Sequence, residues 1–273
     1  MAVRAAYLDG IALWTPLLPG WDIAAPVLRG DAPPPGTVAA RPSPALLAPT
    51  ERRRAPDTVA IALEVGARAC EYAGIDPKAV ASVFASTHGD LAISDYMSDT
   101  LARTPNLVSP IRFHNSVHNA AAGYWSIGTG SMQPYTAITA WGDTFGEGLL
   151  EALVQADTSG RPVLLVAYDI EARGPLACMQ PSRGIVGVGL VVSPSAGART
   201  VARIQWDAVR GTDRTSPLAR NAELLAGNAM AACLPFVEAV AMSVERTVSV
   251  GLSPNMLLEM EFAFPHRKNG SWR

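Results

Sequence analysis

Residues 161–171, RPVLLVAYDIE, contain a continuous apolar run that decides the fold class. A strand with one face in water alternates apolar and polar residues, whereas an unbroken run is typical of a strand buried on both faces. We therefore expect this segment inside a sheet that has helices packed against both of its faces.

Helical and strand-like segments alternate around this strand. The segment Asp57–Ala73 has apolar residues at helical spacing, with Asp57 as a candidate N-cap and Gly74 as the expected end. Strand-like segments occupy residues 3–14, 79–87, 135–140, 184–194, 199–209 and 255–264, and helical segments residues 90–103, 119–130, 143–156 and 221–242. The alternation indicates a layered α/β fold with a largely parallel mixed sheet, which becomes antiparallel towards one end.

The length of 273 residues allows one large folded domain or two small ones, and we expect a single domain over residues 1–273. Of these 273 residues, 49% are hydrophobic and 17% are charged, which supplies a sizeable core. Residues 30–50 are rich in proline and small side chains, so we expect an irregular surface segment there. A polar C-terminal tail is expected over residues 265–273.

Charge and cysteine usage narrow the classes of partner. The net charge is −2 and no long basic run occurs, so neither nucleic acid nor an anionic membrane is the expected partner. No stretch approaches the ~18 uncharged apolar residues of a membrane span, and the N-terminal apolar run is too short for a secretory signal. Three scattered cysteines fit reduced thiols, so we expect a cytoplasmic protein.

Two histidines four residues apart, His114 and His118, form a first candidate site, to which His88 could contribute. Together these imidazoles could ligate a metal, but the pair lacks the adjacent glutamate that gives zinc hydrolases their base. We favour the interpretation that they hydrogen-bond the backbone of a tight turn, and we predict no metal site. The glycine-rich residues 183–192 open a strand rather than a helix, so we read them as close backbone packing and predict no dinucleotide or other cofactor.

Five motifs follow one another in an order known from a family. They are VASVFASTHGD, FHNSVHNAAAGYWSIGTG, YTAITAWGDTFGEGLLEAL, RPVLLVAYDIEA and GIVGVGLVVSP. In this order they resemble the N-terminal half of a beta-ketoacyl synthase, which implies a thiolase-like fold. More narrowly, the chain resembles the short synthase-like proteins identified as chain length factors in aryl polyene pigment biosynthesis.

The resemblance also implies what this chain lacks. A condensing enzyme presents a cysteine between a strand and the N-terminus of a buried helix, where the helix dipole and amides support a thiolate and an oxyanion. Here PIRFH and AAAGYWSI flank that position, which places Val117 or His118 at the nucleophile. No cysteine lies between Phe113 and Asn119, and the only histidine in the C-terminal part of the chain is His266. The resemblance therefore predicts a non-catalytic chain.

A partner subunit follows from the same resemblance. Residues 107–114 are expected to form the strand that pairs with an active beta-ketoacyl synthase in a heterodimer, while acyl carrier protein is reached only indirectly. The predicted interface residues are Leu107, Val108, Ser109, Ile111, Phe113 and His114. Bulky side chains near this interface would shape the partner's acyl tunnel, and the candidates are Phe113, Tyr124 and Trp125.

Two alternatives stay open at this point. The chain could be an independent enzyme, for acyl transfer or a metal-assisted reaction, that uses His114 and His118. It could also be a homodimeric acyl-binding protein with no catalytic partner. The prediction that we favour is a chain-length-factor subunit in polyene, polyketide or fatty-acid-type chain elongation.

Overall fold

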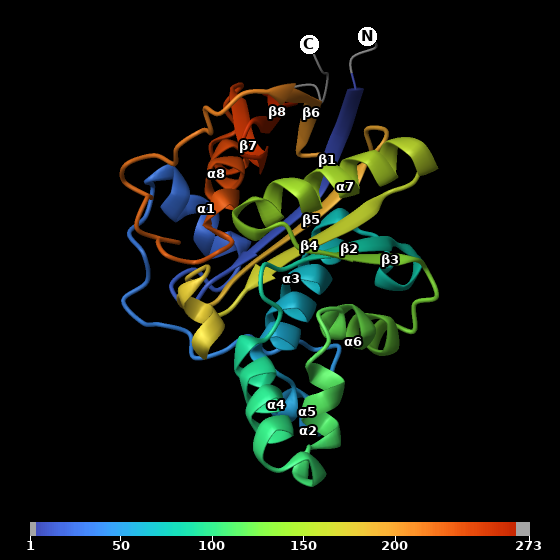
Figure 1. Cartoon of the computed structure of the whole chain (residues 1–273). Coiled ribbons are helices and arrows are strands. Elements are labelled where there is room, and N and C mark those ends of the chain that lie inside the picture. Colours follow the sequence, from blue (N-terminus) through green and yellow to red (C-terminus); the bar gives the residue numbers. More distant parts are fainter. Residues whose placement is uncertain (1–3, 266–273) are drawn as a thin grey trace.

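The computed structural model describes residues 4–265, which form one mixed sheet with helices on both faces (Figure 1). The strand order is β3-β2-β4-β5-β1-β6-β8-β7. The strands are β1 (Arg4–Trp14), β2 (Ala81–Ala85), β3 (Tyr135–Ile138), β4 (Val163–Asp169), β5 (Val186–Ser193), β6 (Ala202–Arg210), β7 (Thr247–Ser253) and β8 (Met256–Ala263). The predicted α/β class is confirmed.

Strand β4, within the apolar run 161–171, is buried along its whole length and lies inside the sheet as expected. It pairs in parallel with β2 and antiparallel with β5. Parallel pairing joins only β3, β2 and β4, so the sheet is less parallel than the sequence suggested. Two neighbouring parallel strands need a crossover connection between them. Strands β4 and β5, and likewise β7 and β8, follow each other in the chain and pair antiparallel, and a short turn joins β7 to β8.

The helices divide into two layers. They are α1 (Trp21–Arg29), α2 (Pro49–Arg54), α3 (Asp57–Ala73), α4 (Leu91–Arg103), α5 (Pro110–Asn115), α6 (Ala120–Thr129), α7 (Thr144–Ser159) and α8 (Leu234–Met242). Helices α3 and α6 share one apolar core with one face of the sheet, while α1, α7 and α8 share the core on the other face. Helices α4 and α5 contact each other and extend away from the sheet (Figure 1).

The glycines of β5 allow α3 to lie close to the sheet. A methyl group at Gly189 would overlap the carbonyl of Val65, and one at Gly187 would overlap the side chain of Ile61. Both partners belong to α3, so larger residues in β5 would push the helix away from the sheet. The prediction that this glycine run serves backbone packing is confirmed.

Two predicted elements are wrong. Residues 107–114 are not a strand: a 3-10 turn, Pro105–Leu107, is followed by helix α5. Ser109 caps this helix through a 3.4 Å hydrogen bond from the Arg112 N–H, and Pro110 occupies the first turn. Both residues favour the start of a helix at this point rather than a strand. The helix expected over residues 221–242 begins only at Leu234, because turns occupy the segment before it.

Several sequence expectations concern parts of the chain without regular structure. No helix or strand lies between the end of α1 and the start of α2, where the irregular segment 30–50 is expected. Apart from Pro265, the expected tail of residues 265–273 lies outside the described residues, and so does His266. Within residues 4–265, no helix combines the length and apolar character that a membrane crossing requires.

Candidate functional site

The turn between β3 and α7 combines a strained backbone with an exposed aromatic side chain. Strand β3 ends at Ile138, and a 3-10 turn, Trp141–Asp143, leads into α7. Trp141 has φ of 51°, a left-handed conformation that large L-residues seldom adopt. Such backbone conformations persist where surrounding contacts impose them, and they concentrate at functional sites.

Two hydroxyl groups hold this conformation in place. Thr144 Oγ1 donates to the Trp141 carbonyl oxygen at 2.7 Å and accepts from the Ala140 N–H at 3.0 Å. Thr87 Oγ1 donates to the same carbonyl at 3.3 Å. The backbone of Trp141 is thus fixed from two elements, while its indole remains 59% exposed.

This turn has the layout that the resemblance required for the nucleophile. A strand leads directly to the N-terminus of a helix whose first residues, Thr144 and Phe145, are buried. Val117 and His118 instead lie between two helices, α5 and α6, so the strand needed before them is absent. Their predicted placement at the nucleophile position depended on a strand that the structure does not form, whereas the turn at Trp141 follows strand β3. An indole offers neither a thiol nor a hydroxyl for acylation.

An ion pair lies beside the start of α7. The carboxylate of Asp143 is 2.7 Å from the guanidinium of Arg214, which comes from the segment between β6 and α8. A Cβ at Gly251 would collide with both side chains, so β7 packs directly against the pair. The negative charge at this helix N-terminus is favourable for the helix dipole, and Arg214 covers it from one side.

A buried carboxylate organises the loop after β2. Asp169, at the end of β4, accepts hydrogen bonds from Ser86 Oγ at 2.9 Å and from the N–H groups of Thr87 and His88 at 3.0 and 3.2 Å. Burial raises the pKa of the Asp169 carboxyl, and these hydrogen bonds oppose the shift in part. Asp169 therefore fixes the loop that carries Thr87 and His88.

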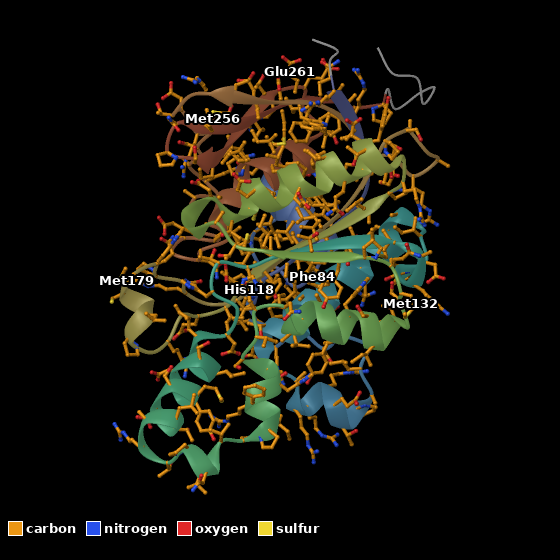
Figure 2. The ribbon with its side chains drawn as sticks, turned by 45° about the vertical axis from the view of Figure 1, so that its right-hand side comes forward. Phe84, His118, Met132, Met179, Met256 and Glu261 are labelled. Atoms are coloured by element: carbon orange, nitrogen blue, oxygen red, sulfur yellow. The ribbon has the colours of Figure 1, made fainter. Side chains whose placement is uncertain are left out.

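The three histidines of the described chain face separate partners. His88 Nε2 donates to the Gln180 carbonyl at 2.7 Å. His118, which is labelled in Figure 2, donates from Nε2 to the Ser86 carbonyl at 2.8 Å. His114 instead packs edge-on against Tyr124, with ring centroids 5.7 Å apart. The backbone interpretation thus holds for His88 and His118. Within residues 4–265, no group of three or more His, Cys, Asp or Glu side chains is arranged to hold a metal ion.

The indole of Trp141 lines a pocket of about 360 Å³, which we call the Trp141 pocket. Its lining residues are Thr87, His88, Leu91, Thr139, Trp141, Leu176 and Met179. They come from the loop after β2, from helix α4, from the turn after β3 and from the segment that follows β4. The pocket therefore lies where the carboxyl ends of three parallel strands meet, a common location for ligand sites in α/β folds.

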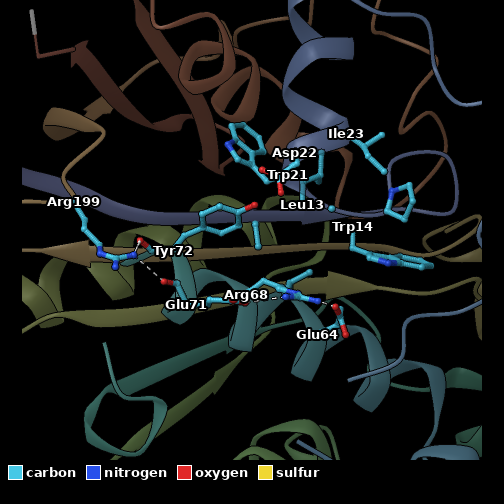
Figure 3. A pocket seen from close by; sticks show the side chains of 14 residues that line it. Leu13, Trp14, Trp21, Asp22, Ile23, Glu64, Arg68, Glu71, Tyr72 and Arg199 are labelled. Carbon is cyan, nitrogen blue, oxygen red and sulfur yellow. Dashed lines mark hydrogen bonds and ion pairs between the residues drawn. The ribbon is translucent and has the colours of Figure 1, made fainter. Parts of the chain in front are cut away.

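A second pocket, of about 530 Å³, lies among the end of β1, the start of α1 and one side of α3 (Figure 3). Its charged groups already have partners within it. Arg68 lies 3.3 Å from Glu64 and 2.9 Å from Glu71, and Arg199 donates to the backbone carbonyls of Glu71 and Tyr72. Because these charged groups already interact with one another, the Trp141 pocket is the better candidate for the functional site.

Several large apolar side chains on and around α5 and α6 are exposed. They are Leu107, Ile111, Phe113, Val117, Ile127 and Met132. Of the three predicted tunnel residues, Phe113 is 61% exposed and Tyr124 is partly buried. Trp125 is buried in the core and packs edge-on against Phe84 at 6.3 Å, so it serves the fold.

Sequence reasoning missed Trp141, Thr144 and Asp169. A signal for the turn was present, because only Trp141 and Gly142 separate the strand-like YTAITA from the helical DTFGEGLLEALVQA. Asp169 ends a buried strand, where a carboxylate needs partners from elsewhere in the chain. Its partners at residues 86–88 are more than 80 positions away, so no local pattern reveals them.

Known proteins share this architecture. A family model described as beta-ketoacyl synthase, N-terminal domain, matches residues 29–248, and no curated protein matches. A chain of the ketosynthase ApeO in complex with its chain length factor ApeC, from Xenorhabdus doucetiae, is 19% identical, with a TM-score of 0.69 over 93% of this chain and 99% of that one. The ishigamide ketosynthase/chain length factor gives 14% identity and a TM-score of 0.72 over 95% and 99%.

A third structure, the AntDE:AntF complex of a type II polyketide synthase acyl-carrier protein with its ketosynthase, contains a chain 9% identical, with a TM-score of 0.71 over 96% of this chain and 99% of that one. Identities this low establish the fold alone, which is the thiolase-like ketosynthase fold. Because the family model spans most of the sequence, the chain belongs to the beta-ketoacyl synthase N-terminal domain family.

Proposed function

We propose that this chain is a non-catalytic, chain-length-factor-like subunit that pairs with an active beta-ketoacyl synthase and shapes its acyl tunnel in polyene, polyketide or fatty-acid-type chain elongation. Trp141 at the turn before α7 carries the proposal, because that turn has the layout in which a condensing enzyme holds its nucleophile. Without a thiol there, this chain forms no acyl thioester at that position, and the condensation takes place on the partner.

The cysteines of the chain do not replace the missing thiol. Cys70 and Cys233 are buried in the two cores, and burial raises the pKa of each thiol to about 12. A thiol with so high a pKa has almost no thiolate at neutral pH. Cys178 is exposed but lies on the 3-10 turn after β4, where no helix N-terminus supports it.

The edge of the sheet supports pairing with a partner. Strand β3 pairs with β2 on one side, and none of the strands described within residues 4–265 pairs with its other side. An open strand edge is a template for another chain, and α5 and α6 carry further exposed apolar side chains, among them Ile111, Phe113 and Ile127. The partner contact therefore includes β3, while the predicted residues Ile111 and Phe113 contribute from a helix rather than from a strand.

Two of the similar structures are described as ketosynthases with chain length factors, which agrees with this proposal. In our proposal the acyl carrier protein delivers substrate to the partner and reaches this chain only indirectly. A catalytic role for His114 and His118 has no geometric support, because their rings face different groups.

Co-expression with the ketosynthase encoded nearest to this chain tests the proposal. We expect a one-to-one complex by size-exclusion chromatography with mass analysis, and condensation on acyl-carrier thioesters that stops when the partner's cysteine is replaced. A homodimer or monomer that ignores the synthase would contradict the pairing. Condensation by this chain alone would contradict the absence of catalysis.

A further inference from the structure

The second pocket, shown in Figure 3, contains three aromatic side chains. Trp14 ends β1, Trp21 begins α1 and Tyr72 lies near the end of α3. The loop between the two tryptophans is closed by two backbone hydrogen bonds of 3.1 Å that Thr15 and Leu18 exchange. Both indoles are therefore held in the wall of the pocket before a ligand binds, which lowers the cost of ordering them.

The two arginines of this pocket already have partners for their charge. The Arg68 guanidinium contacts two carboxylates of α3, at 3.3 Å from Glu64 and 2.9 Å from Glu71. Arg199 donates to the carbonyl oxygens of Glu71 and Tyr72 at 3.2 and 3.1 Å, where the C-terminal end of α3 favours a positive charge. An anionic ligand would have to compete with these groups for either guanidinium.

The carboxylate of Asp22 instead contacts a neutral phenol. Asp22 lies in the first turn of α1 and forms a hydrogen bond with the side chain of Tyr72, beside which Figure 3 shows it. Burial and this hydrogen bond raise the pKa of Tyr72 to about 12, so the phenol keeps its proton at neutral pH. Among the described residues 4–265, no cationic side chain forms an ion pair with Asp22. With three carboxylates and two arginines, the pocket lining has an excess of one negative charge.

We propose that this pocket binds an alkylammonium group, whose charge pairs with the Asp22 carboxylate while the aromatic side chains of the pocket contact its alkyl groups. Aromatic faces attract cations, and rings of this kind recognise methylated ammonium groups. The volume of about 530 Å³ lies within the range of small-molecule sites, so the ligand can extend beyond its ammonium group. The pocket shares no lining residue with the Trp141 pocket, so the inference goes beyond the proposed function and does not depend on a partner.

Choline and 3,3-dimethyl-1-butanol, in which a neutral carbon replaces the ammonium nitrogen, test the inference on the isolated chain. With 5-fluorotryptophan labelling, we expect choline to shift the ¹⁹F signals of Trp14 and Trp21 saturably, each assigned by its loss in Trp14→Phe or Trp21→Phe. Trp141 is 59% exposed and lies outside this pocket, so its signal is the internal control. Choline should bind about tenfold more tightly than the alcohol, because only choline gains from the carboxylate and from cation–π contacts.

Asp22→Asn separates the charge of the pocket from its shape. The substitution should weaken choline binding about tenfold and leave binding of the alcohol unchanged. Asp31→Asn is the matched control, because Asp31 lies beyond the other end of α1, pairs with Arg29 and does not line the pocket. This control should change neither affinity.

Three results would overturn the inference: no saturable shift at Trp21, equal affinity for choline and the alcohol, or unchanged choline binding in a folded Asp22→Asn variant. Tighter binding of 3,3-dimethylbutanoate than of choline would also overturn it, because the arginines would then select the ligand. Free ammonium compounds and lipid headgroups share this chemistry. Cosedimentation with phosphatidylcholine vesicles that is lost in Asp22→Asn would identify a headgroup as the source, whereas choline binding without cosedimentation would identify a free compound.

Discussion

The hydroxyl of Thr144 lies 2.7 Å from the carbonyl oxygen of Trp141 and binds the first residue of α7 to a residue with left-handed backbone geometry. Thr144 Oγ1 also accepts a hydrogen bond from the Ala140 N–H, so a single side chain closes the turn from both ends. Thr144 is buried, and its hydrogen bond couples the backbone conformation of Trp141 to the start of α7.

Replacement of Thr144 by valine should therefore destabilise the protein. The substitution conserves shape but leaves the Ala140 N–H without its side-chain acceptor, which costs about 1–3 kcal/mol in the free energy of unfolding. Chemical denaturation measures this change. Thr158→Val is the matched control, because Thr158 is an exposed residue of the same helix, and its substitution should stay within about 0.5 kcal/mol. Equal effects in both variants would contradict a special role for Thr144.

The buried carboxylate of Asp169 predicts a pH dependence of stability. Because its pKa is raised in the folded state, the folded protein binds more protons than the unfolded chain between the usual pKa of about 4 and the raised value. In that interval the contribution of Asp169 to stability falls as pH rises, and above the raised pKa it is constant.

A comparison with Asp169→Asn isolates this effect from the other carboxyl groups. The variant should be less stable throughout, because an amide cannot accept from Ser86, Thr87 and His88 as a carboxyl does. The difference in unfolding free energy between wild type and variant should be largest at acidic pH and should shrink as pH rises. A difference that grows with pH would show that the pKa of Asp169 is lowered instead.

Trp141→Cys tests whether a thiol at the turn before α7 is enough to give this chain condensing activity. The introduced thiol should react with iodoacetamide, as should the exposed Cys178, whereas Cys70 and Cys233 should stay unmodified until the protein unfolds. We expect no condensation of malonyl-thioester by this variant, because His88 and His118 are hydrogen-bonded to backbone carbonyls and His266 is the only histidine in the C-terminal part of the sequence. Mass spectrometry and a condensation assay provide the two measurements, and restored condensation would contradict the expectation.

The fold could be predicted where a single physical cause governs the pattern. Burial on both faces of the sheet accounts for the apolar sequence of β4, and close packing against α3 accounts for the glycines of β5. The prediction failed at residues 107–114, which the resemblance assigned to an interface strand although Ser109 and Pro110 start a helix. Ile111 and Phe113 are apolar and exposed, which fits a surface for contact with another chain better than a core strand.

The site was harder to predict than the fold, because its parts are not chemically conspicuous in the sequence. Trp141 carries no titratable group, and a positive φ at a residue other than glycine has no reliable sequence signal. The histidines attracted attention because of their chemistry, yet His88 and His118 serve the backbone. The contacts that define the site join segments far apart in the chain, so they become visible only in three dimensions.

The exposed side chain of Phe113 provides a direct test of the pairing surface. Phe113→Asp places a charge in an apolar contact, and aromatic residues at interface centres often contribute 2 kcal/mol or more. We therefore expect affinity for the ketosynthase to fall about 30-fold or more, with an unchanged melting temperature of the isolated chain because Phe113 supports no core. Val244→Asp is the control, since Val244 is also exposed but lies between α8 and β7, away from the β3 edge. Biolayer interferometry with the purified synthase gives both affinities. Equal losses of affinity in the two variants would indicate a general effect of added charge. An unchanged affinity in Phe113→Asp would show that α5 is outside the contact, and the open edge of β3 would then be the surface to test.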